Sequence, residues 1–149
     1  MRVVQLRASG LRVVIDTNIL ISGLLAAGSL PARLIVLWRL GRFNMLTSMA
    51  QLDEMMRVTR YPKLRDRIVP ALAGRLINDM RELATMVPDG PLVAVSPDPD
   101  DDYLLALASA GGANFLVTGD KRDVLGLGRY RGAEIIGVRA FLDLNWARR

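Results

Sequence analysis

Carboxylate side chains that follow predicted strands are the clearest sign of chemistry in this chain. Asp16 comes directly after the apolar, β-branched run 13–15, and Asp120 follows another predicted strand. Four aspartates gather within 98–102, shortly after a strand predicted over 92–95. Because open parallel sheets bind ligands at the carboxyl ends of their strands, we expect these acidic groups to meet in one crevice.

A fourth segment adds Glu54, which lies in the second turn of a helix predicted over 48–59. Taken singly, Asp16, Asp102 and Asp120 are each explained as helix caps, since aspartate stabilises helix N-termini. Glu54 alone is explained as a solvated helix residue. Several carboxylates in one strand-end crevice, however, repel one another unless a cation lies between them. The combination therefore predicts a cation site.

Composition narrows the identity of that cation. The chain contains no cysteine and no histidine, which excludes disulfides, Cys/His zinc sites and catalysis by a histidine base. Mg²⁺ and Mn²⁺ suit carboxylate and water ligands, whereas Ca²⁺ is disfavoured because the sequence lacks an EF-hand loop. The net charge is +5, from 20 basic and 15 acidic residues, which favours a polyanionic partner or simply reflects a basic surface. A metal held by carboxylates in a basic protein points to phosphodiester chemistry.

The elements that position these acids alternate between strands and helices. Short apolar runs predict strands over 13–15, 43–47, 92–95, 115–118 and 134–138. Helical periodicity and capping residues predict helices over 18–24, 31–40, 48–59, 68–86, 103–110, 120–127 and 139–144. Ser48 and Gln51 fit a capping box at the start of the third helix.

This alternation predicts an α/β fold, a three-layer α/β/α sandwich around a mainly parallel central sheet. A length of 149 residues without an internal linker indicates one domain. We expect this domain to span 12–149, with 1–11 as an N-terminal extension.

Four motifs occur in a fixed order along the chain. They are VVIDTNIL at 13–20, a serine followed six residues later by a glutamate at 48–54, DPDDDYLLALA at 98–108, and LVTGDK at 116–121. Together, over about 12–142, they resemble the PIN domain family, and most of all the prokaryotic toxins of toxin–antitoxin pairs. The resemblance implies a PIN-like fold and a ribonuclease that depends on Mg²⁺ or Mn²⁺.

By that resemblance, the acidic catalytic pocket consists of Asp16, Glu54, Asp102 and Asp120. The implied metal ligands are Asp16, Asp102 and Asp120. Glu54 would orient the attacking water or a metal-bound water. Asn18 and Thr118 would hold the carboxylates in place by hydrogen bonds, and Asp101 could share or replace the role of Asp102.

The resemblance also implies an RNA substrate, a cognate antitoxin protein and a homodimer. Candidate contacts to the RNA backbone are Arg57, Arg60, Lys63, Lys121 and Arg122, although a solvated helix and loop explain the run 57–67 equally well. Trp38 and the helix 31–40 fit core packing, and in the family such helices also serve dimer and antitoxin contacts. No apolar run reaches the roughly 20 residues of a membrane span, and the N-terminus lacks a secretory signal, so we expect a cytoplasmic protein without a membrane partner.

Three alternatives remain open from the sequence. One is an RNA-processing nuclease that is no toxin. Another is a PIN-like domain that binds RNA or protein without cutting, against which the full set of four acids argues. The third is a phosphoacceptor receiver domain, which is also α/β but needs an acidic pair after its first strand, where this chain has only Asp16.

Overall fold

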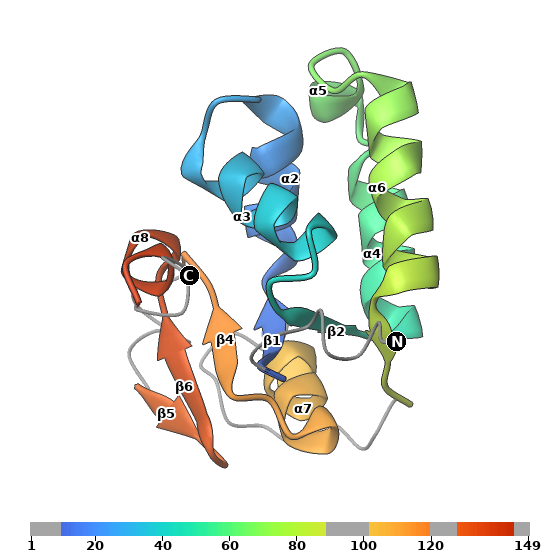
Figure 1. The fold of residues 1–149 in the computed structure, drawn as a ribbon. Coiled ribbons are helices and arrows are strands. Elements are labelled where there is room, and N and C mark those ends of the chain that lie inside the picture. The colour runs from blue at the N-terminus through green and yellow to red at the C-terminus, as the bar shows by residue number, and fades with distance from the viewer. Residues whose placement is uncertain (1–9, 89–101, 120–127, 145–149) are drawn as a thin grey trace.

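The computed structural model describes residues 10–88, 102–119 and 128–144 (Figure 1). These residues form six strands and seven helices. The strands are β1 (Arg12–Ile15), β2 (Asn44–Thr47), β3 (Thr85–Met86), β4 (Phe115–Val117), β5 (Arg129–Tyr130) and β6 (Ala133–Ile136). The helices are α2 (Thr17–Leu25), α3 (Leu30–Arg39), α4 (Met49–Val58), α5 (Pro62–Arg65), α6 (Pro70–Leu83), α7 (Asp102–Gly111) and α8 (Val138–Leu142).

The six strands form one sheet in the order β3-β2-β1-β4-β6-β5. Every neighbouring pair in this sheet is parallel except β5 and β6, which are antiparallel. The prediction of a mainly parallel sheet is therefore confirmed. β1 lies between β2 and β4, with Val13 opposite Met45 on one side and Phe115 on the other. The carboxyl end of β1 consequently lies in the middle of the sheet edge.

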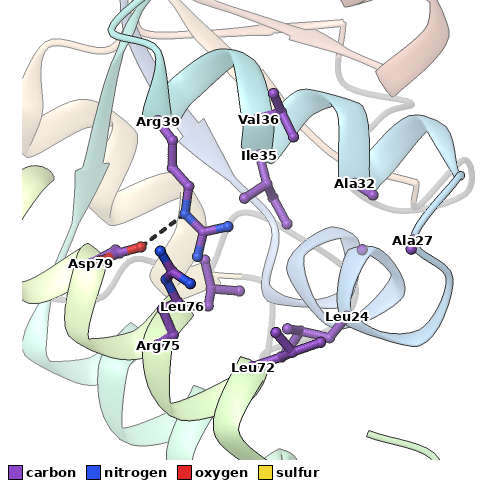
Figure 2. A pocket seen from close by; sticks show the side chains of 11 residues that line it. Leu24, Ala27, Ala32, Ile35, Val36, Arg39, Leu72, Arg75, Leu76 and Asp79 are labelled. Carbon is purple, nitrogen blue, oxygen red and sulfur yellow. Dashed lines mark hydrogen bonds and ion pairs between the residues drawn. The ribbon is translucent and has the colours of Figure 1, made fainter. Parts of the chain in front are cut away.

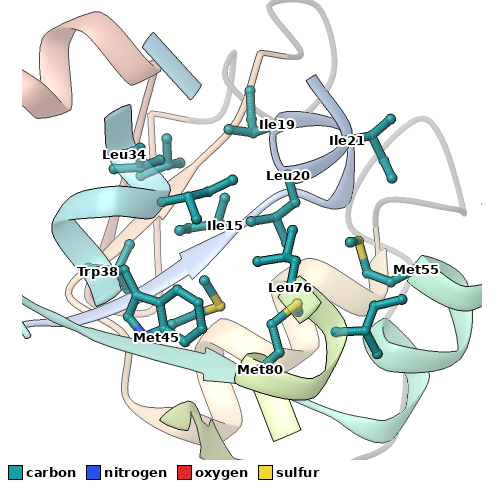
Figure 3. Packing of buried hydrophobic residues seen from close by; sticks show 14 of the residues in the cluster. Ile15, Ile19, Leu20, Ile21, Leu34, Trp38, Met45, Met55, Leu76 and Met80 are labelled. Carbon is teal, nitrogen blue, oxygen red and sulfur yellow. The ribbon is translucent and has the colours of Figure 1, made fainter. Parts of the chain in front are cut away.

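Successive residues of the strands face opposite layers, as the pleat of a sheet requires. Val13 and Ile15 pack into the larger core with α2, α3, α4, α6 and α8, while Val14 packs with Leu104 and Leu105 of α7 on the other face. Figure 1 shows α7 set apart from the remaining helices, and Figure 3 shows Trp38 and Met80 in the larger core. The three-layer α/β/α arrangement is thus confirmed.

The helix stripe that the sequence predicts as core is indeed buried. Leu34, Ile35 and Trp38 of α3 are at most 5 % exposed. These side chains account for the apolar face of α3, because their burial removes apolar surface from water.

The helix predicted over 68–86 was too long. Val69 is the N-cap and Pro70 occupies the first turn of α6, where its fixed φ suits the helix. The last predicted residues, Thr85–Met86, instead form β3 and pair with β2, a tertiary contact that overrides local periodicity. The short elements α5 and β5 had no prediction. The strand predicted over 92–95 and the helix over 120–127 lie outside the described residues, as do residues 1–9 of the expected extension.

Within the described ranges, no single helix is long and apolar enough to cross a membrane. Only α2 and α3 taken together have the length and apolar composition of a membrane-spanning segment, and the chain bends by 104° between these two helices. Both helices contribute side chains to the larger core.

Gly23 marks the close approach of α2 and α3. A Cβ atom at this position would lie 2.6 Å from Cδ1 of Ile35 and 3.3 Å from backbone atoms of Pro31 and Ala32. A methyl group here therefore requires Cδ1 of Ile35 to move and the backbone at the start of α3 to shift by a few tenths of an ångström. By contrast, a Cβ atom on Gly74 in α6 would meet nothing within 4 Å.

We predict that Gly23→Ala lowers the free energy of unfolding by about 1 kcal/mol, because overpacking outweighs the better helix propensity of alanine. The matched control Gly74→Ala should raise it by about 0.5–1 kcal/mol, since only propensity changes there. Urea denaturation measures both. A change of the same sign in the two variants would contradict the close approach at Gly23.

Candidate active site

Asp16 lies where β1 ends and α2 begins, and only 4 % of the residue is exposed. It is the N-cap of α2: its Oδ1 accepts a hydrogen bond from the backbone N–H of Asn18 at 2.9 Å. Its Oδ2 accepts a hydrogen bond from the hydroxyl of Thr118 at 2.7 Å. These two bonds fix the orientation of a buried carboxylate at the strand end.

This carboxylate lies at the topological switch point of the sheet. From β1 the chain passes to β2 and β3 on one side, and it later returns to β4 on the other side. Thr118 follows β4 directly, is fully buried, and donates its backbone N–H to the carbonyl of Ile136 at 3.0 Å. Crevices at such switch points are where open α/β sheets bind their ligands. Asp16 and Thr118 therefore flank the expected ligand position.

A chain of side-chain hydrogen bonds leads from β1 to Glu54. Gln51 donates from Nε2 to the carbonyl oxygen of Ile15 at 2.7 Å and to Oγ1 of Thr17 at 3.4 Å. Oγ1 of Thr17 lies 2.8 Å from the hydroxyl of Tyr103, which donates to Oε1 of Glu54. Since a hydroxyl has one hydrogen, Thr17 must donate to Tyr103. All donors thus run in one direction, from Gln51 towards Glu54.

The electrostatics of Tyr103 keep its hydroxyl protonated. Burial raises the pKa of Tyr103 well above its ordinary value, and the hydrogen bond to the Glu54 carboxylate raises it further. The hydrogen bond with Thr17 acts in the opposite direction, and the negative charges of Glu54 and Asp16 add to the rise. Tyr103 is therefore a neutral hydrogen-bond donor across the working pH range of an enzyme.

Glu54 also faces a cation. Its Oε2 lies 4.0 Å from Nη2 of Arg57, one turn further along α4, and the glutamate side chain is 26 % exposed. Arg57 in turn donates from Nε to the hydroxyl of Tyr61 at 3.4 Å. The carboxylate is therefore held on Oε1 by Tyr103, while Oε2 faces Arg57.

The other predicted site residues are distributed as follows. Asn18 is exposed, and its contact with Asp16 runs through its backbone N–H. Asp102 is the first residue of α7, directly before Tyr103. Arg57, Arg60 and Lys63 are exposed on and just after α4. The remaining predicted residues, Asp101, Asp120, Lys121 and Arg122, lie outside the described residues.

The described side chains fit a hard cation only in part. Over residues 10–88, 102–119 and 128–144, no group of three acidic residues stands close enough to hold a metal ion. Asp16 and Glu54 supply oxygen ligands of the type that Mg²⁺ and Mn²⁺ prefer, and Mg²⁺ needs only one or two carboxylates besides water and substrate oxygens. Asp102 begins α7 directly before Tyr103, whose hydroxyl contacts both Thr17 and Glu54.

Sequence reasoning missed Tyr103, Thr17 and the role of Gln51. The predicted capping box is half correct: the Gln51 N–H donates to Oγ of Ser48 at 3.2 Å, but its side chain reaches Ile15 and accepts from Thr47 at 2.7 Å. The sequence did contain one signal for this contact: Gln51 lies on the apolar face of the predicted helix, and a buried polar side chain needs a hydrogen-bond partner. Such a residue predicts a hydrogen bond without naming its partner.

A family model described as PIN domain matches residues 12–122, which is more than half of the chain. The matched range contains the whole hydrogen-bond chain and all the predicted acids. A search of the curated proteins returns no match.

We predict that Tyr103 and Glu54 are energetically coupled. Removing the phenol oxygen by Tyr103→Phe leaves the carboxylate without its buried donor, and hydrogen bonds to charged groups contribute about 1.5–3 kcal/mol. A double-mutant cycle with Glu54→Ala, which removes the acceptor, measured by urea denaturation in EDTA, should give a coupling of that size. The matched cycle of Tyr103→Phe with Asp53→Ala, on the exposed neighbour of Glu54, should give a coupling near zero. Equal couplings in the two cycles would contradict the assigned hydrogen bond.

Proposed function

We propose, from the premise that the chain belongs to the PIN domain family, that it is an endoribonuclease that hydrolyses RNA phosphodiester bonds with the help of Mg²⁺ or Mn²⁺. PIN domains are mostly metal-dependent nucleases. The observation that carries the proposal is the buried Asp16 carboxylate, fixed at the switch point of the sheet beside the hydrogen-bond chain that ends at Glu54. The family match also favours a nuclease over a phosphoacceptor receiver domain.

The proposed pocket combines Asp16 and Glu54 with Asp102 and Asp120. Asp16, Asp102 and Asp120 would hold the cation, and Asp101 would support or replace Asp102. A bound Mg²⁺ or Mn²⁺ supplies a lowered pKa for its water ligand and stabilises negative charge on the leaving oxygen. Thr118 keeps the Asp16 carboxylate pointed at the crevice, and the backbone N–H of Asn18 holds its other oxygen.

Glu54 is the proposed base. Tyr103 fixes Oε1, which leaves Oε2 to accept a proton from the attacking water. In the hydrolysis, the water oxygen forms a bond to phosphorus, the P–O bond to the leaving ribose oxygen breaks, and Glu54 accepts the water proton. The hydrogen bond from the neutral Tyr103 keeps the carboxylate in position for this transfer.

The exposed basic residues near Glu54 are the proposed contacts to the RNA backbone. Arg57, Arg60 and Lys63 follow Glu54 along the chain and have long, exposed side chains. Lys121 and Arg122, which directly follow Asp120 in the sequence, are proposed to contact the RNA backbone as well. Phosphate contacts of this kind make affinity depend strongly on salt, because each releases counterions.

We further propose that the enzyme is a cytoplasmic toxin, that a cognate antitoxin inhibits it and that it forms a homodimer. A hollow of about 290 Å³ between α2, α3 and α6 is a candidate partner surface (Figure 2). Val36 and Leu72 beside it are about half exposed, and the ion pair of Arg39 with Asp79, at 2.8 Å, closes one side. An RNA-processing nuclease, or a PIN domain that binds without cutting, remains the alternative.

We predict that the purified chain cleaves single-stranded RNA in Mn²⁺ or Mg²⁺ and that EDTA abolishes cleavage. Asp16→Asn should lower the rate about 100-fold or more, because it removes a proposed metal ligand. Thr118→Val should lower it about 10–100-fold, the usual effect of losing a group that orients a ligand. Gel analysis of labelled RNA measures both, with Asp53→Asn as the unaffected control.

The same variants separate the alternatives. Full activity of Asp16→Asn, or cleavage in EDTA, would overturn the metal mechanism. RNA binding without cleavage in any metal would favour the non-catalytic alternative. Expression of the parent chain, but not of Asp16→Asn, should arrest growth of a bacterial host if the chain is a toxin, whereas normal growth with both favours RNA processing.

A further inference from the structure

A second hollow, of about 480 Å³, lies between α4, α5 and α6, which stand side by side in Figure 1. We call it the α4–α6 hollow. Its lining includes the apolar side chains of Met56, Ile68 and Ile77, of which Ile68 and Ile77 are 4 % and 7 % exposed. Arg60 and Arg65 also line it and are exposed to solvent. The hollow thus combines an apolar wall with two guanidinium groups.

The charge around the α4–α6 hollow is one-sided. None of its lining residues is acidic. The segment 57–67 contains five basic residues and one acid, Asp66. In the described part of the chain, neither Arg60 nor Arg65 makes an ion pair or a side-chain hydrogen bond. The hollow therefore suits an anionic ligand that also has an apolar, flat part.

The α4–α6 hollow begins close to Glu54. Met56 and Arg60 stand two and six residues after Glu54, and α4 rises about 1.5 Å per residue, so the hollow starts within about 9 Å along the helix axis. Arg57, which lies 4.0 Å from Glu54, is exposed between them. A strand of RNA with one phosphate at Glu54 can follow Arg57 and Arg60 around the exposed side of α4.

We propose that the α4–α6 hollow receives one unstacked nucleobase of the RNA substrate, while Arg60 and Arg65 contact the adjoining phosphates. Guanidinium groups bind phosphate bidentately and stack on bases, and the flexible thioether side chain of the partly exposed Met56 can pack against a base. This inference rests on the proposed function, because it places the hollow along the same RNA strand. It adds a contact to a base, which the phosphate contacts alone do not provide.

Gly74 allows a direct test of the base site. It lines the hollow from the middle of α6, and a Cβ atom at this position would meet nothing within 4 Å. Gly74→Leu fills the hollow and introduces a better helix former, so the variant should fold at least as stably as the parent. Its binding to a labelled single-stranded RNA of about 12 nucleotides, measured by fluorescence anisotropy in EDTA, should weaken about tenfold. Gly74→Ala, which adds one methyl group, should bind nearly as tightly as the parent.

Charge variants and a ligand without bases separate base contact from phosphate contact. Gly74→Leu should leave affinity for inorganic polyphosphate unchanged, whereas Arg60→Gln and Arg65→Gln should weaken binding of both polyphosphate and RNA. Arg75→Gln is the matched control, because Arg75 is an exposed arginine of α6 that lines the other hollow. It should change RNA affinity less than Arg60→Gln does.

Unchanged RNA binding by Gly74→Leu, or equal losses for RNA and polyphosphate, would overturn the base site. Absence of RNA binding by the parent would overturn it as well. Tight binding of an oligoglutamate peptide to the parent, lost in Gly74→Leu, with weak RNA binding would assign the hollow to an acidic protein partner. Because binding is measured without metal, it does not depend on cleavage. If the parent chain cleaves no RNA but Gly74→Leu still weakens RNA binding, the base site is supported and only the proposed function is contradicted.

Discussion

The site depends on holding a carboxylate, Asp16, in a buried position at the end of the central strand. Burying an ionised group is costly unless hydrogen bonds or a cation compensate for the lost water. The N–H of Asn18 and the hydroxyl of Thr118 provide two such bonds, from the start of α2 and from the end of β4. The position of Thr118 in turn depends on the parallel pairing of β4 with β1 and β6. The parallel sheet therefore positions the Asp16 carboxylate.

The hydrogen-bond chain that runs from Gln51 through Thr17 and Tyr103 to Glu54 fixes further side chains near the end of β1. It joins β1, α2, α4 and α7, and its most distant contacting pair, Thr17 of α2 and Tyr103 of α7, is 86 positions apart in the sequence. Each of the two hydroxyls in the chain has a single hydrogen, so the donor from Gln51 determines how Thr17 and Tyr103 point their hydrogens. Glu54 consequently occupies a fixed place relative to the end of β1, where Asp16 follows Ile15.

Local signals predicted the fold and part of the site. The strands predicted within the described residues, the Ser48 cap and the strand-end position of Asp16 followed from short-range patterns, and the structure has them. β3 was missed because two residues of pairing with β2 carry no pattern of their own. The link between Tyr103 and Glu54 was missed because it depends on a contact across 49 residues, which no spacing rule encodes.

Calorimetric titration with Mn²⁺ tests the central claim, that Asp16 belongs to a metal site shared with the other acids. The parent chain should bind Mn²⁺, Asp16→Asn and Asp102→Asn should each weaken binding at least about tenfold, and Asp53→Asn on the exposed side of α4 should bind like the parent. No Mn²⁺ binding by the parent, or parental affinity in both Asp16→Asn and Asp102→Asn, would contradict the shared site.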